Sequence, residues 1–198
     1  MKGFSPAADN NKSPILSVLT TYLADGDRVF EVGSGSGQHA IYMAASLPNI
    51  QWIASERAST LPLLSENLND YATPNIAEPT VLDLAEAAEP NNLGVQCIYA
   101  ANVVHIVSEP LVVNLMNWAG SALDETGFLI LYGPYRYKNE FTTVSNQNFD
   151  RWLKDRDPQS GVRDFEWVNA LALNAGLSLV EDRSMPANNQ CLVFQKRG

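Results

Sequence analysis

Three glycines at alternate positions, Gly33, Gly35 and Gly37, directly follow the strand-like run 28–32. Glycine lets the backbone turn tightly and lets a ligand approach main-chain atoms that a Cβ would block. A helix is expected from Gln38, so its first N–H groups would face the same turn. A turn of this kind without a ligand is the less favoured alternative, because it costs backbone entropy without a purpose. The spacing therefore predicts a ligand-binding turn.

An acidic residue, Glu31, stands two positions before the first glycine. Dinucleotide sites prefer GxGxxG or GxGxxA after the strand, and the residues from Gly35 to Ala40 also fit that pattern. An acid two residues before GxGxG instead resembles the first motif of methyltransferases that use S-adenosylmethionine. A carboxylate suits the ammonium group of that cofactor and would repel a pyrophosphate. The motif favours S-adenosylmethionine over a nicotinamide dinucleotide.

Two further acidic residues follow the next two predicted strands. Glu56 directly follows the strand 51–55, roughly 20 residues after the glycines, where a carboxylate can accept hydrogen bonds from ribose hydroxyls. Asp83 follows the strand 80–82 and could accept from the adenine amino group, while the backbone N–H of Leu84 contacts a ring nitrogen. Each acid alone could be an ordinary exposed residue. Their order at the ends of consecutive strands is what predicts a cofactor site.

The segment that leaves the fourth predicted strand supplies the candidate catalytic group. His105 is the only side chain near this strand end that could titrate close to neutral pH, so it could act as a base or hold the acceptor. The alternative is that Asn102 and His105 satisfy backbone groups or pack under the cofactor. Methyl transfer needs alignment and exclusion of water more than a base. His39, on the helix after the glycines, is expected to be structural or a cofactor contact.

Strand and helix alternate five times along the first two thirds of the chain. This alternation predicts an α/β fold: a doubly wound, Rossmann-like class I methyltransferase sheet, mostly parallel. An antiparallel C-terminal hairpin is expected from 177–182 and 191–195. A helix is expected to open at Pro14 with Ser13 as its cap, a weak helix over 84–88, and a loop-rich stretch over 133–163.

Composition narrows the class of protein. The chain has 198 residues, 45% of them hydrophobic, and a net charge of −9, which exclude disorder as the main state. The negative charge disfavours unaided binding to nucleic acid or to an anionic membrane. Two histidines and two cysteines in separate places predict no metal site. Without an apolar run of about 18 residues, a soluble cytoplasmic protein is expected.

Over nearly its whole length the chain resembles the methyltransferase-like protein 26 family, small class I methyltransferase-like proteins also filed as a domain of unknown function. Two positions depart from the family pattern: Asn10 stands where an Arg is usual, and Glu56 stands where the second-strand acid is commonly Asp. The segments that carry the resemblance are Asn11 with 14–16, 31–39, Asn102 with His105, 131–135, 145–146 with 149–150, 157–158 with 161–164, and 185–189.

The resemblance implies a methyltransferase fold and S-adenosylmethionine binding, without a defined substrate. His105 and Tyr135 are the predicted catalytic residues. Predicted substrate-binding residues lie in the region after the fifth strand: Asn146, Arg163, Asn188 and Asn189. Predicted cofactor-binding residues are Asn11, Glu31, Gly33, Ser34, Gly35, Gly37, His39, Glu56, Asp83, Leu84 and Asn102. The equally weighted alternative for the later region is a structural ion network of Asp150, Arg163 and Asp164 that ties the loop down.

Together these features predict one domain over 1–198, with an N-terminal segment and helix (1–27), a cofactor-binding core (28–132), and a lid with the closing hairpin (133–198). The predicted function is in-line methyl transfer from S-adenosylmethionine to a small-molecule acceptor, with neither nucleic acid nor membrane as partner. The reacting atom of the acceptor, and the choice between monomer and homodimer, stay open. The alternatives are a nicotinamide-dependent oxidoreductase and a non-catalytic S-adenosylmethionine-binding protein.

Overall fold

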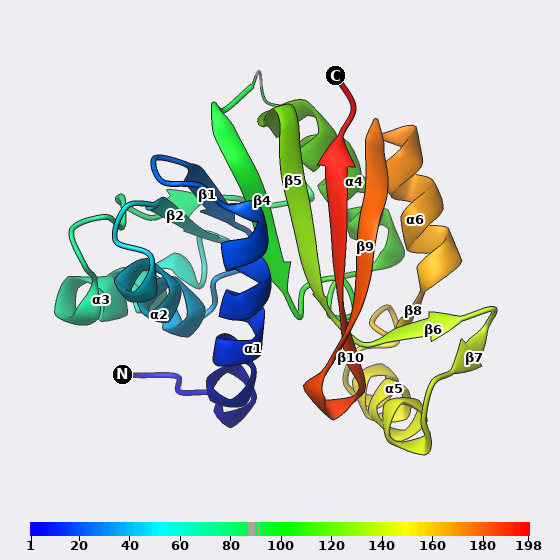
Figure 1. Cartoon of the computed structure of the whole chain (residues 1–198). Coiled ribbons are helices and arrows are strands. Elements are labelled where there is room, and N and C mark those ends of the chain that lie inside the picture. The colour runs from blue at the N-terminus through cyan, green and yellow to red at the C-terminus, as the bar shows by residue number, and fades with distance from the viewer. Residues whose placement is uncertain (87–89, 91) are drawn as a thin grey trace.

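A seven-stranded sheet forms the centre of the computed structural model, which describes residues 1–86, 90 and 92–198 (Figure 1). Strands from β3 to β5 run parallel, and β10 runs antiparallel to both of its neighbours. The predicted mostly parallel sheet with a C-terminal antiparallel hairpin is confirmed. In spatial order the strands are β3 (Thr80–Val81), β2 (Gln51–Glu56), β1 (Arg28–Glu31), β4 (Val95–Ala101), β5 (Leu123–Gly133), β10 (Asn189–Lys196) and β9 (Leu177–Met185).

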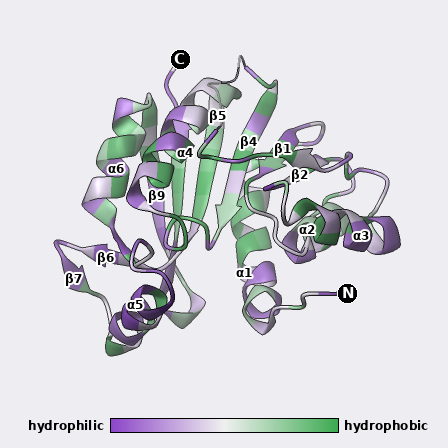
Figure 2. Cartoon of the chain, turned by 180° about the vertical axis from the view of Figure 1, so that it is seen from behind, coloured by the Kyte–Doolittle hydropathy of each residue, from purple (hydrophilic) through white to green (hydrophobic). Residues whose placement is uncertain are grey.

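Helices cover both faces of this sheet. The helices α1, α2 and α3 lie on the face toward the viewer in Figure 1, and α4 and α6 lie on the face seen in Figure 2. Each layer buries its own apolar cluster: Ile15 and Met43 belong to the first, and Leu115 and Val168 to the second. The helices flanking the sheet are α1 (Pro6–Tyr22), α2 (Gln38–Ser46), α3 (Leu61–Tyr71), α4 (Glu109–Ala122) and α6 (Phe165–Asn174).

The strand order reverses beside β1, which pairs with β2 on one side and with β4 on the other. Glu31, the last residue of β1, lies in register with Ala54 of β2 and Tyr99 of β4. In open α/β sheets, ligands bind outside the carboxyl ends of the strands at such a reversal. The topology therefore places the glycine turn at the position where this fold class binds its ligands.

A smaller unit lies beyond the carboxyl ends of the parallel strands. In Figure 1 this unit, the first turn of α1 and the β9–β10 turn all lie at the lower end of the sheet. These segments therefore surround the end at which the glycine turn lies. The unit consists of β6 (Tyr135–Tyr137), β7 (Glu140–Phe141), α5 (Val144–Arg156) and β8 (Arg163–Asp164), and the β9–β10 turn carries the short 3-10 helix η1 (Pro186–Asn188).

The predicted start of the first helix is wrong. Helix α1 begins at Pro6 rather than at Pro14, which lies inside it. The Ser5–Pro6 pair carries the same start signal as the later Ser–Pro pair, and the Ser5 hydroxyl accepts from the Ala8 N–H at 3.3 Å. The helix continues through Pro14 because the adjacent turns bury side chains of the protein interior, among them Ile15.

The stretch predicted as loop-rich contains the thirteen-residue helix α5, whose N-cap is Thr143. Its buried side chains are Asn146, Asp150 and Leu153, which lie on one face at helical spacing. Two of the three are polar, so a search for apolar periodicity could not find this helix. Of the weak helix expected over 84–88, residues 84–86 form a turn, and 87–88 lie outside the described residues.

Candidate functional site

All three glycines of the turn have positive φ angles, namely 70° for Gly33, 57° for Gly35 and 81° for Gly37. A Cβ on Gly33 would lie 2.9 Å from Val103 Cγ2, and one on Gly37 would lie 2.8 Å from Leu64 Cδ1. A Cβ on Gly35 would have no described heavy atom within 4 Å. The outer two glycines therefore allow close packing, whereas the middle one borders space that a ligand could occupy.

The carboxyl group of Glu31 is buried at the end of β1. Its Oε2 accepts from the Trp52 indole N–H at 2.9 Å, and the nearby Ser34 hydroxyl also favours the charged form by lowering the pKa. Burial raises the pKa of Glu31 to about 7 despite these two donors, and nearby Glu56 raises it further. In the described part of the chain no Lys, Arg or His forms an ion pair with it. A buried carboxyl supported only by neutral donors suits a cationic ligand group.

Backbone hydrogen bonds fix the glycine turn to the end of β2. The Ser34 N–H donates to the Ser55 carbonyl at 2.9 Å, and the Ser55 N–H donates to the Ser34 hydroxyl at 3.2 Å. The Ser55 hydroxyl donates to the Glu31 carbonyl at 2.7 Å. Ser34 thus supports both the turn and the carboxylate, and Ser55 was not predicted from the sequence because its role depends on a contact between two strands.

Glu56 and Asp83 follow at the same edge of the sheet. Glu56 lies in register with Val81, and its carbonyl accepts from the Leu82 N–H at 3.0 Å. The Asp83 Oδ1 accepts from the Ala85 N–H at 2.9 Å, which leaves Oδ2 with no partner among the described residues. The predicted order of acids at successive strand ends therefore matches the placement of these residues.

Leu84 is buried, and its carbonyl accepts from the Asn114 side chain of α4 at 2.8 Å. This bond ties the turn that carries Asp83 to the helix layer behind the sheet.

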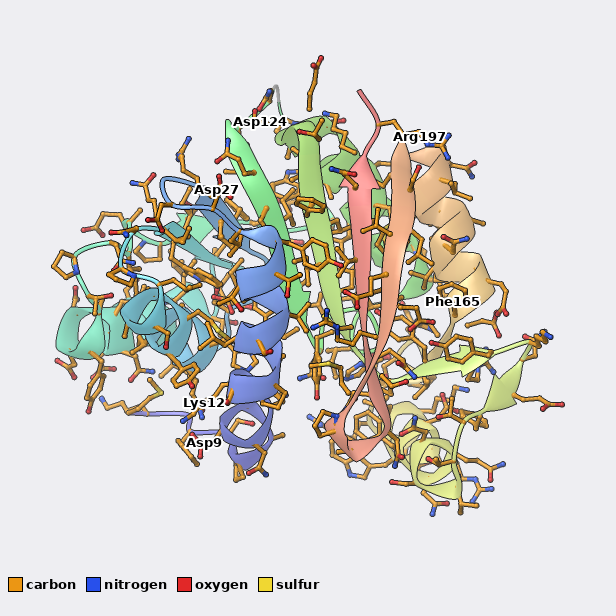
Figure 3. All side chains as sticks on the ribbon, viewed as in Figure 1. Asp9, Lys12, Asp27, Asp124, Phe165 and Arg197 are labelled. Carbon is orange, nitrogen blue, oxygen red and sulfur yellow. The ribbon has the colours of Figure 1, made fainter. Side chains whose placement is uncertain are left out.

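Asn11 and His39 belong to a buried network that joins α1 to the sheet. The Tyr99 hydroxyl lies 3.0 Å from His39 Nδ1, and His39 Nε2 lies 2.7 Å from Asn11 Oδ1 and 3.2 Å from the Ala8 carbonyl. Burial lowers the pKa of His39, so the neutral ring can accept from Tyr99 and donate to Asn11. The ion pair of Asp9 with Lys12 marks the same turns of α1 in Figure 3.

Tyr132, near the end of β5, extends this network toward the β9–β10 turn. The side chains of Asn11 and Asn189 both lie close enough to its hydroxyl to lower the pKa of Tyr132, although burial raises this pKa overall. The structure thus brings together Asn11 and Asn189, two predicted site residues that are far apart in the sequence. Tyr99 and Tyr132 were missed by the sequence analysis. The signal that could have found them is a tyrosine near the end of an otherwise apolar strand, in a position where its hydroxyl needs a partner.

The segment after β4 holds Asn102 and His105. Asn102 has a φ of 60°, and its N–H donates to the Tyr132 carbonyl at 2.8 Å. His105 is buried, its ring centroid lies 5.3 Å from that of Phe149 in α5, and burial together with Arg163 lowers its pKa to about 4. The imidazole is therefore neutral at pH 7 and can accept a proton, although it is a weak base.

Asn146 fixes the start of α5 to the β9–β10 turn. Its Nδ2 donates to the Asn188 carbonyl and to the Thr142 hydroxyl, both at 2.9 Å. The Asn189 side chain donates to the Pro186 carbonyl at 3.1 Å. Three of the four predicted substrate-binding residues therefore lie together around this turn.

Arg163 is placed differently. It is buried, its Nε donates to the Val104 carbonyl at 3.3 Å, and its Nη2 donates to the Val107 and Gln159 carbonyls at 2.6 Å each. Its Nη1 lies 3.5 Å from a Glu109 carboxyl oxygen. These bonds favour the alternative in which Arg163 ties the loop down, with backbone carbonyls rather than an ion network as its main partners. Its predicted role in substrate binding stays a prediction.

A family model described as "Protein of unknown function (DUF938)" matches residues 2–196. The chain belongs to the DUF938 family. The match leaves out only one residue at the N-terminus and two at the C-terminus of the chain.

Solved structures similar to this DUF938 chain include three methyltransferases. A putative O-methyltransferase from Nostoc punctiforme PCC 73102 has a TM-score of 0.81 and 19% identity, over 96% of this chain and 57% of that one. An O-methyltransferase family 2 protein from Planctomyces limnophilus DSM 3776, in complex with apigenin, has a TM-score of 0.77 and 16% identity, over 96% of this chain and 60% of that one. Human N-acetylserotonin methyltransferase, in complex with S-adenosylmethionine, has a TM-score of 0.79 and 13% identity, over 97% of this chain and 53% of that one.

The DUF938 chain thus spans little more than half the length of these proteins. At such identities the likeness shows the fold, which is that of S-adenosylmethionine-dependent methyltransferases. Among the described helices, none is long and apolar enough to cross a membrane. Among the described side chains, no group of three or more His, Cys, Asp or Glu is placed to hold a metal ion.

Tyr135, the second predicted catalytic residue, is buried in the DUF938 chain with a hydroxyl that has no hydrogen-bond partner among the described residues. Burial raises the pKa of this phenol far above its usual range, so it is protonated. A buried hydroxyl without a partner costs about 1–3 kcal/mol. We therefore expect Tyr135→Phe to raise the free energy of unfolding by about 1 kcal/mol, measured by urea denaturation.

Tyr137→Phe is the matched control, because the Tyr137 hydroxyl donates to Asp182 Oδ2 at 2.8 Å and its loss should not stabilise the protein. A loss of stability in Tyr135→Phe would show that the hydroxyl has a partner, such as a buried water.

Proposed function

We propose that this chain binds S-adenosylmethionine at the glycine turn and transfers its methyl group to a small-molecule acceptor. The observation that carries the proposal is the pairing of Gly35, which borders open space, with a buried carboxyl at Glu31 that no described cation neutralises. A ligand with an ammonium group fits this pair, and a pyrophosphate does not. The likeness of the fold to S-adenosylmethionine-dependent methyltransferases supports the same conclusion.

The proposed cofactor site follows the edge of the sheet. Glu31 would face the ammonium group, Glu56 would accept from the ribose hydroxyls, and Asp83 with the Leu84 N–H would face the adenine. Asn102 would lie beside the cofactor after β4, and Asn11 and His39 would hold α1 in place beside it. The remaining residues of the proposed site belong to the turn itself: Gly33, Ser34, Gly35 and Gly37.

When bound, S-adenosylmethionine would supply a methyl carbon to a lone pair of the acceptor. The new bond would form as the carbon–sulfur bond breaks, with the electrons of the broken bond staying on sulfur and the acceptor losing its proton. The chain's contribution is to align the acceptor and exclude water. We propose His105 as the group that accepts this proton or holds the acceptor, because it is neutral and close to the end of β4. Tyr135 is the second proposed catalytic group, as a hydrogen-bond donor.

The acceptor is proposed to bind where α1, α5 and the β9–β10 turn meet, with Asn146, Asn188 and Asn189 at its edge and Arg163 behind. Two of the similar structures are named as O-methyltransferases, and one of these holds apigenin, which supports a small molecule as acceptor. Three finer statements stay predictions: the single domain over 1–198, the resemblance to the methyltransferase-like protein 26 family, and the cytoplasmic location.

Calorimetric titration of the full chain with S-adenosylhomocysteine and with NADH tests the cofactor. We expect saturable binding of S-adenosylhomocysteine and none of NADH, because the carboxyl of Glu31 repels a pyrophosphate. Single substitutions of His105 and Asn188 should leave this affinity nearly unchanged if both residues serve the acceptor. Tight NADH binding without a response to S-adenosylhomocysteine would identify the oxidoreductase alternative and reject the proposal.

Transfer itself is tested with methyl-labelled S-adenosylmethionine and a size-fractionated cell lysate. Label should appear in the small-molecule fraction, and His105→Asn should abolish or strongly reduce it while cofactor binding persists. Binding of the cofactor with no labelled product in any fraction would identify the chain as a non-catalytic S-adenosylmethionine-binding protein.

A further inference from the structure

A cavity of about 350 Å³ lies between the start of α4, the end of α5 and β8. Its lining includes Ser108, which directly precedes α4, Glu109 from α4, Lys154 from α5, Arg136 from β6 and Arg163 from β8. Phe165, labelled in Figure 3, marks the position where β8 passes into α6. No residue of the glycine turn lines this cavity.

The cavity is unusually basic for this protein. Three of the thirteen Lys and Arg residues line it, against one carboxylate, in a chain with a net charge of −9. Lys154 forms an ion pair with Asp150 at 2.7 Å, and Arg163 is held mainly by backbone carbonyls. Glu109 lies 3.5 Å from Arg163, and Asp164 lies in register with Arg136, which lowers the pKa of that carboxyl, so each cation has a carboxylate in its neighbourhood.

Arg136 is the guanidinium that has no acceptor. Its Nε is buried without a hydrogen-bond partner, and among the described residues no ion pair or hydrogen bond of its side chain is found. Its one described contact of note is with the Phe141 ring, whose centroid lies 5.5 Å from Cζ. A guanidinium has five N–H donors, and partly burying it without acceptors is costly. For the buried Nε, this cost favours an oxygen acceptor that the described residues do not supply.

The start of α4 adds to the positive potential. Ser108 is the N-cap of this fourteen-residue helix, but its hydroxyl makes no capping hydrogen bond. The hydroxyl is thus available as a donor, and the helix dipole places partial positive charge at the same end. Arg163 holds the facing segment rigid, because the Val104 and Val107 carbonyls accept from it.

The same segment contacts both the glycine turn and the cavity wall, through different residues. The glycine turn contacts Val103, whereas Arg163 of the cavity wall contacts the Val104 and Val107 carbonyls. This placement makes the cavity a site of its own.

We propose that this cavity binds a small organic oxyanion, a phosphate ester or a carboxylate, with Arg136 as its principal ligand. The paired N–H groups of a guanidinium match two oxygens of either anion, and Lys154 and the Ser108 hydroxyl complete the donor set. The volume exceeds that of an inorganic phosphate and leaves room for a small organic group. The inference does not depend on methyl transfer or on the cofactor.

Calorimetric titration of the full chain with phenyl phosphate and with benzoate tests the site, since the two probes share a ring and differ in the anion. We expect saturable binding of at least one probe with a dissociation constant below about 1 mM. The stronger probe identifies which anion the site prefers. Arg136→Gln should weaken this binding at least tenfold, and Arg136→Lys should restore part of it.

Arg151→Gln is the matched control, because Arg151 is an exposed arginine of α5 that hydrogen-bonds only Asn148 among the described residues. It should leave the affinity unchanged. Saturating S-adenosylhomocysteine should also leave it unchanged if the two sites are separate. The proposal is overturned if neither probe binds saturably, if Arg136→Gln binds as well as the unaltered protein, or if S-adenosylhomocysteine displaces the probe.

Discussion

Glu31→Gln should weaken the binding of S-adenosylhomocysteine by about 10- to 100-fold at pH 8 while stabilising the empty protein. The weakening follows because a hydrogen bond to a charged group contributes about 1.5–3 kcal/mol, and glutamine keeps the shape but not the charge. The Trp52 N–H can still donate to the amide oxygen, so the buried indole keeps its partner.

The gain in stability follows from the pKa of Glu31. Burial raises it to about 7 from 4.5, the value of the unfolded chain. Between these two pH values the folded protein holds a proton that the unfolded chain has lost, so stability falls as pH rises from 4.5 to 7 and then levels off. A shift of this size corresponds to roughly 3 kcal/mol at pH 8, and glutamine removes that cost.

Cofactor affinity should show the opposite dependence on pH. A cationic group binds the carboxylate form, so below pH 7 binding must displace a proton from Glu31. Affinity should therefore fall by about tenfold for each pH unit below 7 in the unaltered protein, and Glu31→Gln should flatten this profile. The measurements are calorimetry between pH 5.5 and 8.5 and urea denaturation of the empty protein.

Glu125→Gln is the control for both measurements, because Glu125 is exposed in β5 and far along the chain from the turn. It should change neither affinity nor stability. Unchanged affinity in Glu31→Gln would remove the observation on which the proposed function rests. Lower stability at pH 8 would show that the charged carboxylate has a partner outside the described contacts.

The placement of the proposed cofactor residues along one edge of the sheet could be predicted because its signals are local in the sequence. Glu31 and the glycines lie within seven residues, and parallel pairing then places Glu56 and Asp83 at the same edge by topology alone. No knowledge of side-chain contacts was needed for that step. The fold class followed for the same reason, since alternating strands and helices leave few possible sheets.

The contacts made by α1 and α5 could not be predicted in this way. His39 meets Tyr99 and Asn11 across 60 and 28 residues, and Asn146 meets the Asn188 backbone across 42. Such contacts depend on how α1 and α5 sit on the sheet, and α5 presents a mostly polar buried face that gives no periodic signal. The family resemblance identified Asn11, His39, Asn146 and Asn188 as candidate site residues, and only the tertiary structure shows their partners.

The contacts of Arg163 also depend on the tertiary structure and could not be predicted from the sequence. The second large effect is expected when this residue is replaced. Arg163→Met should lower the free energy of unfolding by about 3 kcal/mol, because it leaves the carbonyls of Val104, Val107 and Gln159 without their donor. Methionine keeps much of the side-chain volume, so the loss reports the hydrogen bonds rather than a void. In a domain of this size the midpoint of thermal unfolding should fall by about 6–12 °C.

Arg151→Met, a change of the same kind at an exposed position of α5, should stay within about 0.5 kcal/mol of the unaltered protein. The comparison separates the two roles left open for Arg163. If Arg163 instead holds the acceptor, Arg163→Met should raise the KM for that acceptor and leave the unfolding midpoint nearly unchanged. A fall in the midpoint, with the KM of the remaining folded protein unaltered, would assign Arg163 to tying residues 104–107 to β8. That segment carries His105, so the stability of the loop and the position of the proposed catalytic group depend on the same guanidinium.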